Sequence, residues 1–178
     1  MDKSESLWEE NLNKIKNDPR CNLFNWQKRL LSLKFLNSNS KQNQVQINPI
    51  NFTISIPSNA LNISEDFIKV CLAHEIGHVV DCSILASLYI IAIISGLFGL
   101  CYTWFYVLSI IIWISYYVYR YKYNQKEKEY EADDMAVTLF GKDKVKLWLS
   151  NLGMRFGKND IISQKSKDLL KKRIERLN

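Results

Sequence analysis

No two cysteines in this sequence are separated by two residues, the spacing found in cysteine zinc sites and dithiol redox motifs. The four cysteines are scattered, at positions 21, 71, 82 and 101. This pattern excludes a cysteine-held zinc ion and a disulfide framework, and it suits a reducing compartment. The first twenty residues are acidic and polar, so they do not predict a secretory signal peptide.

Charged residues are absent from Cys82 to Tyr119, a block of 38 residues. One membrane span needs about 20 apolar residues, so the block has the length of two short spans. Small residues within 95–99 suit a turn near its middle, and aromatic residues gather beside that turn and at the far end. The sequence therefore predicts a two-helix transmembrane hairpin at 82–119. The alternative is a buried helical hairpin in a protein without spans.

A net positive charge is lacking before this block and present after it. Residues 1–81 hold nine Lys/Arg and nine Asp/Glu, whereas residues 120–178 hold fifteen and nine. A positive excess beside a span is typical of the cytoplasmic side. We therefore expect a multi-pass cell-membrane protein with two spans, both termini in the cytoplasm, the lipid bilayer as a partner and no nucleic-acid partner. The alternative is an ordinary solvated helical face.

Proline is also scarce, with three residues in total and none after Pro57. Helical periodicity and capping residues predict helices over 4–18, 22–36, 124–141, 142–152 and 163–177, and another that starts after Ser64. β-Rich stretches at 45–47 and 52–56 predict a hairpin. The expected fold is mainly α and integral to the membrane, with a small β element. Its expected divisions are 1–44, a core over 45–141 interrupted by the hairpin 82–119, and C-terminal helices over 142–178.

Histidine occurs only twice, and both residues fall in the sequence "HEIGH", as His74 and His78. Positions four apart lie on one face of a helix, where two imidazoles can hold one zinc ion. Glu75 between them can take a proton from water that the metal activates. The alternative is a pair of core histidines with ordinary hydrogen bonds. A catalytic zinc ion usually has three protein ligands, so a third ligand must come from elsewhere.

The third ligand is predicted in "EYEADDMA", where Glu129 and Asp133 are four residues apart. Glu129 is the predicted metal ligand, and Asp133 is predicted to accept the free N–H of a ligand imidazole. Ala132 and Ala136 share that face, and Gly77 and Ala73 on the first helix are also small, so the two helices could approach closely. The alternative is that this acidic run is solvated surface.

The sequence "LAHEIGHVVD", followed by the apolar block and "EYEADDMA", resembles the membrane zinc metallopeptidases of the HtpX and CAAX prenyl endopeptidase group. The resemblance covers about residues 50–141. It implies a zincin-like fold in which one Zn²⁺ per chain is bound by His74, His78 and Glu129, with Glu75 as the catalytic base. It also implies that a peptide substrate pairs with the strand before the metal helix, which here comprises Phe52, Thr53, Ile54, Ser55 and Ile56.

This resemblance implies a membrane-bound zinc endopeptidase that cuts membrane or membrane-proximal proteins on the cytoplasmic face. Two other interpretations stay open: a site-specific protease like the ImmA/IrrE regulators, and a membrane protein that binds zinc without catalysis. No histidine follows the second motif to stabilise an oxyanion, and the sequence does not select among Arg155 and several tyrosines for that role. The substrate and the oligomeric state are not determined by the sequence.

Overall fold

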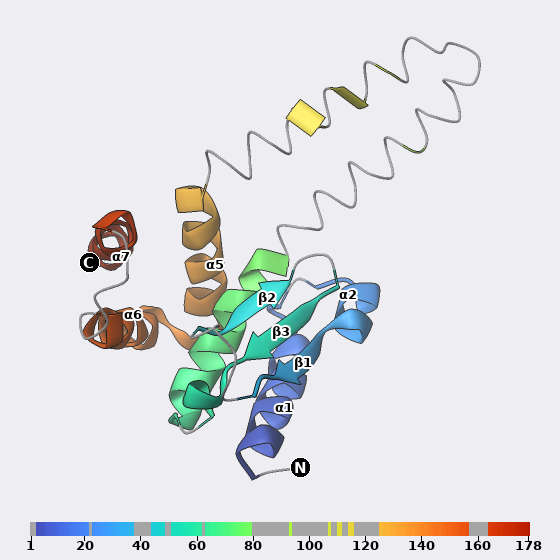
Figure 1. Ribbon diagram of the computed structural model, residues 1–178, viewed down its shortest axis with the longest axis horizontal. Coiled ribbons are helices and arrows are strands. Elements are labelled where there is room, and N and C mark those ends of the chain that lie inside the picture. Colours follow the sequence, from blue (N-terminus) through green and yellow to red (C-terminus); the bar gives the residue numbers. More distant parts are fainter. Residues whose placement is uncertain are drawn as a thin grey trace.

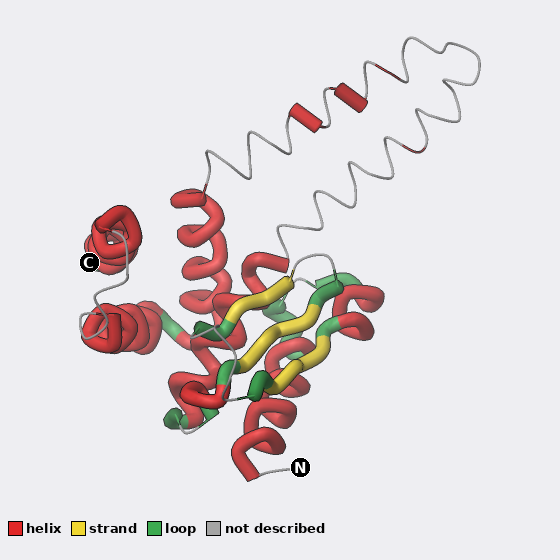
Figure 2. The backbone as a smooth tube through the Cα atoms, in the orientation of Figure 1, coloured by secondary structure: helices red, strands yellow, loops and turns green. Residues whose placement is uncertain are grey.

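The computed structural model describes residues 3–21, 23–37, 44–48, 51–61, 63–79, 125–156 and 164–178, and six more between 93 and 115. The elements in chain order are α1 (Lys3–Lys16), α2 (Asn25–Leu30), β1 (Ser32–Phe35), β2 (Gln46–Asn48), β3 (Thr53–Ile56), the 3-10 turn η1 (Ser58–Ala60), a helix through 65–79, α5 (Gln125–Phe140), α6 (Lys142–Phe156) and α7 (Gln164–Arg176) (Figures 1 and 2). The helix through 65–79 contains the "HEIGH" sequence and is called the HEIGH helix below.

The three strands form one sheet in the order β1-β3-β2. β2 and β3 pair antiparallel, with Ile47 opposite Ile54, so the predicted hairpin is confirmed. β1 pairs with β3 in parallel, with Leu33 opposite Ile54. β3 is therefore the central strand, and β1 and β2 are the two outer strands.

The helix predicted over 22–36 is wrong in its second half. Only Asn25–Leu30 is helical, and the chain becomes extended at Leu31 (φ −61°, ψ 119°). The next residues form β1, where Ser32 N–H donates to the Phe52 carbonyl. Their apolar spacing fits a helix, but pairing with a strand some twenty residues later satisfies the backbone instead. Such long-range pairing is invisible to local periodicity.

The predicted integral membrane fold is also wrong. Within the described residues, no helix is both long enough and apolar enough to cross a membrane. A span needs about 20 apolar residues, whereas α5 as described has 16 residues and many charged side chains. The described chain is instead a small, mostly helical domain with a three-stranded sheet.

The multi-pass membrane localisation depended on those spans and is corrected with them, including the cytoplasmic placement of both termini. The hairpin predicted over 82–119 lies outside the described residues, apart from six of them.

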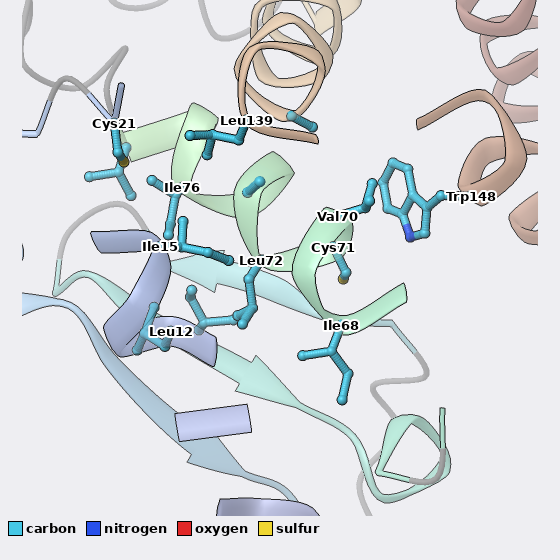
Figure 3. Packing of buried hydrophobic residues seen from close by; sticks show 14 of the residues in the cluster. Leu12, Ile15, Cys21, Ile68, Val70, Cys71, Leu72, Ile76, Leu139 and Trp148 are labelled. Carbon is cyan, nitrogen blue, oxygen red and sulfur yellow. The ribbon is translucent and has the colours of Figure 1, made fainter. Parts of the chain in front are cut away.

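One hydrophobic core joins α1, the sheet and most of the helices of the described chain. Its members come from α1, the sheet, the HEIGH helix, α5 and α6, and they include Trp8, Ile54, Ile56 and Leu149. Figure 3 labels other members of the same core, among them Leu12, Ile15, Ile68, Leu72, Ile76 and Leu139. α1 belongs to this core and β1 to the sheet, so both pack together with the later elements of the described chain. The HEIGH helix is buried along the face that meets α1 and the sheet, which fixes its rotation about its own axis.

Candidate metal centre

The HEIGH helix begins after Ser64, as predicted, because Ile68 N–H donates to the Ser64 carbonyl. Its residues from Val70 to Ile76 are buried, since the sheet and the neighbouring helices cover them. His74 and His78 are one turn apart, and their ring centroids are 4.8 Å apart at an interplanar angle of 79°. The two imidazoles therefore lie on the same face of the helix.

Small residues bring α5 against this helix. A Cβ atom placed on Gly77 would lie 2.6 Å from Ala132 Cα and 3.1 Å from the Ala132 carbonyl oxygen. The first distance is shorter than real Cβ contacts allow and the second is tight, so only glycine fits at this crossing without a shift of the backbone. The predicted close approach of the two helices is confirmed, and it places the acidic residues of α5 beside the two histidines.

Glu129 reaches both histidines from α5. Its Oε2 lies 3.4 Å from His74 Nε2, and its Oε1 lies 3.7 Å from His78 Nε2. The ligand atoms of these three residues all lie within 4.8 Å of one another, close enough to hold a metal ion. Among the described residues, these three form the group of histidine, cysteine and acidic side chains that could hold a metal ion.

Asp133 contacts the other ring nitrogen of His74, Nδ1. Its Oδ1 lies 3.0 Å from His74 Nδ1, and both side chains are buried. A carboxylate only accepts hydrogen bonds, so Nδ1 carries the proton in this contact. The contact fixes the ring and leaves Nε2 on the side of Glu129, where an imidazole that binds a metal needs it.

Arg173 also belongs to this centre, although the sequence motifs did not predict it. It comes from α7 and is only 8% exposed. Its Nε and Nη2 donate to the two oxygens of Asp133 at 2.8 and 2.6 Å, and its Nη1 lies 2.7 Å from Glu129 Oε2. One signal was present in the sequence: Arg173 lies at helical spacing between Leu170 and Leu177, in the apolar stripe of α7.

Trp148 of α6 packs over the same group. Its ring centroid is 5.1 Å from that of His74, and the Arg173 guanidinium carbon lies 5.9 Å from the indole. Figure 3 shows this ring beside Val70 of the HEIGH helix. The indole excludes solvent from the inner side of the imidazole, so the contacts among His74, Asp133 and Arg173 form in an environment of low polarity.

Glu75 is buried but is not part of the three-ligand group. Its Oε2 accepts a hydrogen bond from the Ile47 N–H of β2 at 2.8 Å. Burial raises the pKa of Glu75 to about 7, although the charge of His74 and the Ile47 N–H oppose the shift. The proton affinity of this carboxyl group is therefore close to that required of a base at neutral pH.

The metal-free histidines differ in proton affinity. Burial by itself lowers the pKa of His74, but the carboxylates of Asp133 and Glu129 outweigh it and raise the pKa to about 9. Burial and the neighbouring His74 lower the pKa of His78 to about 4. Burial opposes ionisation of Glu129, yet His74 and Arg173 lower its pKa to about 2. At neutral pH the centre thus has one charged imidazole, one neutral imidazole and an ionised Glu129.

The predicted substrate strand is not placed to pair with a peptide. β3 is bonded to β1 on one edge and to β2 on the other, so Thr53–Ile56 has no open edge for an added strand. Phe52 lies in the turn before β3 with φ of 54°, and the side chains of Ile54 and Ile56 are fully buried in the core. Of the two outer strands, β2 is the one whose backbone contacts Glu75. It lies toward α5 in the view of Figure 1.

Arg155, one candidate for stabilising an oxyanion, has a side chain outside the described set. Comparison of the chain with protein-family models, curated proteins and solved structures gave no match.

Proposed function

We propose that this protein is a zinc-dependent endopeptidase. The observation that carries the proposal is that Glu75 lies apart from the candidate metal ligands on the HEIGH helix. His74 and His78 converge with Glu129, while Glu75 stays outside that group, buried and bonded to the backbone of β2. A purely structural metal site has no need of a buried carboxylate beside its ligands. The resemblance of the two motifs to the HtpX and CAAX prenyl endopeptidase group supports the same proposal.

The donor set favours zinc. Two imidazoles and one carboxylate are a common ligand set of catalytic zinc, which keeps a fourth position open. Zinc–ligand bonds of about 2.0 to 2.2 Å place tetrahedral donors roughly 3.4 Å apart. The separations of 3.4 and 3.7 Å between Glu129 and the two histidines are close to that value. To accept the ion the side chains would have to draw together, because their ligand atoms are up to 4.8 Å apart in this structure.

Zinc bound at these residues would lower the pKa of a water molecule toward 7 and polarise a peptide carbonyl group. Glu75 then takes a proton from the attacking water and delivers it to the nitrogen of the departing chain. Asp133 and Arg173 keep His74 in one orientation throughout. Trp148 excludes water from behind the ring.

The test is zinc content and proteolysis of reduced casein, measured on the same preparations. Wild type should contain about one zinc per chain and cleave casein. Glu129→Ala should lose zinc, and Glu131→Ala, an exposed neighbour on α5, should retain it. Glu75→Gln should retain zinc and lose hydrolysis, because it keeps the shape of the side chain but removes the base.

Two results would overturn this proposal. Hydrolysis retained by Glu75→Gln would remove Glu75 from its role as the base. Zinc binding by a wild type that cleaves no unfolded protein would favour the non-catalytic zinc site instead.

A further inference from the structure

The outer edge of β2 can be assigned residue by residue. Ser32 N–H donates to the Phe52 carbonyl and Leu36 N–H to the Ile56 carbonyl, so the even-numbered residues of β3 face β1. Backbone groups of successive residues point to opposite edges of a strand, so Thr53 and Ser55 face β2. Their partners are Asn48 and Gln46. Ile47 lies between these two, and its N–H and carbonyl therefore point away from the sheet.

An outer edge of this kind binds extended peptides. A peptide that adds as a strand needs an outward N–H and an outward carbonyl on the same residue, and Ile47 supplies both. The side chains of Gln46 and Asn48 beside it are exposed. The edge also lies next to the residue proposed as the catalytic base. An extended peptide chain is therefore the occupant that this edge fits.

The Ile47 N–H, however, is already engaged, because it donates to Glu75 Oε2 at 2.8 Å. An amide has a single hydrogen, and a peptide carbonyl that pairs with Ile47 must approach along the same direction to a similar distance. Glu75 and the peptide carbonyl cannot both accept it with good geometry.

We propose that the Ile47 N–H is a shared donor, which holds Glu75 in the free protein and passes to the peptide chain when it pairs with β2. Peptide binding thereby releases Glu75 from the strand, so the base is freed only when a substrate is in place. This inference rests on the proposed function, since it gives that same base a substrate-dependent restraint. The restraint limits the reaction of Glu75 when no peptide is bound.

The experiment compares Glu75→Gln with Glu75→Ala, both loaded with zinc. Neither has the base, so neither cleaves the probe, but Gln retains an oxygen that accepts from Ile47 and Ala does not. The probe is a fluorescein-labelled fragment of reduced casein, and binding is followed by fluorescence anisotropy. Glu75→Ala should bind the probe about two- to twelvefold more tightly, the equivalent of one net hydrogen bond. Equal or weaker binding by Glu75→Ala would overturn the proposal.

A proline at position 47 supplies the matched control. Ile47→Pro removes the outward N–H without removing a hydrogen bond to β3, and outer strands tolerate proline at such positions. In the Glu75→Ala background, Ile47→Pro should abolish the gain in affinity, whereas Ile47→Val should keep it. A gain that persists with Ile47→Pro would show that the donor is not Ile47.

Amide hydrogen exchange of Ile47, read by NMR without any peptide, separates this inference from the proposed function. Exchange should be slow in wild type and in Glu75→Gln and at least severalfold faster in Glu75→Ala. Unchanged exchange in Glu75→Ala would overturn the shared donor even if casein is hydrolysed. Conversely, a wild type that fails to hydrolyse casein would overturn the proposed function while the exchange result stood.

Discussion

Asp133 receives three donors at once, two from Arg173 and one from His74. The planar guanidinium matches both carboxylate oxygens, so the pair is fixed in direction as well as in distance. Burial makes Asp133 harder to ionise, but His74 and Arg173 lower its pKa below the ordinary value. Arg173, 40 positions after Asp133 in the chain, therefore helps to keep Asp133 ionised, and the ionised Asp133 orients the His74 imidazole.

Arg173→Ala should destabilise the metal-free protein by roughly 3 kcal/mol or more, because it removes one of the two cations that pair with the buried Asp133 and the partly buried Glu129. Arg176→Ala is the control on the same helix. Arg176 pairs with Asp134 at the surface, and such pairs contribute about 1 kcal/mol or less. Urea unfolding followed by circular dichroism checks both values. Equal losses for the two variants would contradict the structural role assigned to Arg173.

Zinc binding should become tighter with rising pH. A ligand imidazole must be unprotonated, and the pKa of His74 in the metal-free protein is raised to about 9. Below pH 9 the ion therefore displaces a proton from His74, and the apparent affinity should rise about tenfold per pH unit between roughly pH 7 and 9. Calorimetry in two buffers of different ionisation enthalpy measures the proton released. An affinity that is flat over this interval would contradict the pKa assigned to His74.

Sequence alone was enough to place the four residues of the two motifs that converge here, His74, His78, Glu129 and Asp133. Their spacing encodes their position, because residues four apart must share a helix face. Arg173 could not be predicted in the same way. A cation within an apolar stripe is unusual, but its partners depend on how α7 docks, and no local rule specifies that docking.

At the scale of elements, the contact between the HEIGH helix and α5 decides whether the ligands meet. Gly77 and Ala132 set the separation of these two helices. The sequence predicted this contact from its small residues. It did not predict the end of α2 or the start of β1, because the strand partner lies elsewhere in the chain.

Gly77→Ala should weaken zinc binding and destabilise the protein. In an ordinary helix the same change is favourable by roughly 0.5 to 1 kcal/mol. Here the added methyl would lie 2.6 Å from Ala132 Cα, so α5 must move away and carry Glu129 with it. Zinc affinity measured by competition with a chromogenic chelator, together with the melting temperature, tests this.

The partner variant Ala132→Gly should not restore zinc binding to Gly77→Ala. The closest atom is the Ala132 backbone Cα, which glycine retains. Full recovery in the double variant would show that the contact limiting the approach is with the Ala132 side chain.

At the scale of the whole molecule, the centre draws on the HEIGH helix, α5 and α7, with β2 and α6 supporting it. None of these elements holds the site by itself. A metal ion held there would therefore be coupled to the folding of the whole described domain rather than to one loop. All of these elements contribute side chains to one hydrophobic core, so a change in one of them affects the stability of the others.

Zinc should accordingly raise the melting temperature of the protein. At one hundred times its Kd, a ligand stabilises the folded state by about 2.7 kcal/mol. For a chain of this size that corresponds to roughly 5 to 10 °C. Differential scanning calorimetry with zinc and with EDTA measures the shift. It should vanish in Glu129→Ala and persist in Glu131→Ala, and a shift of equal size in both would place the metal elsewhere.

The position of Arg173 also determines when the centre can form during synthesis. The ribosome adds His78 long before Arg173, and at translation rates of about 5 to 20 residues per second the interval is roughly 5 to 20 s. From its own synthesis until that of Arg173, 40 residues later, Asp133 lacks the guanidinium that pairs with it. A nascent chain therefore carries the histidines before it carries a completed site. Its proposed proteolytic activity begins only after α7 has emerged and docked.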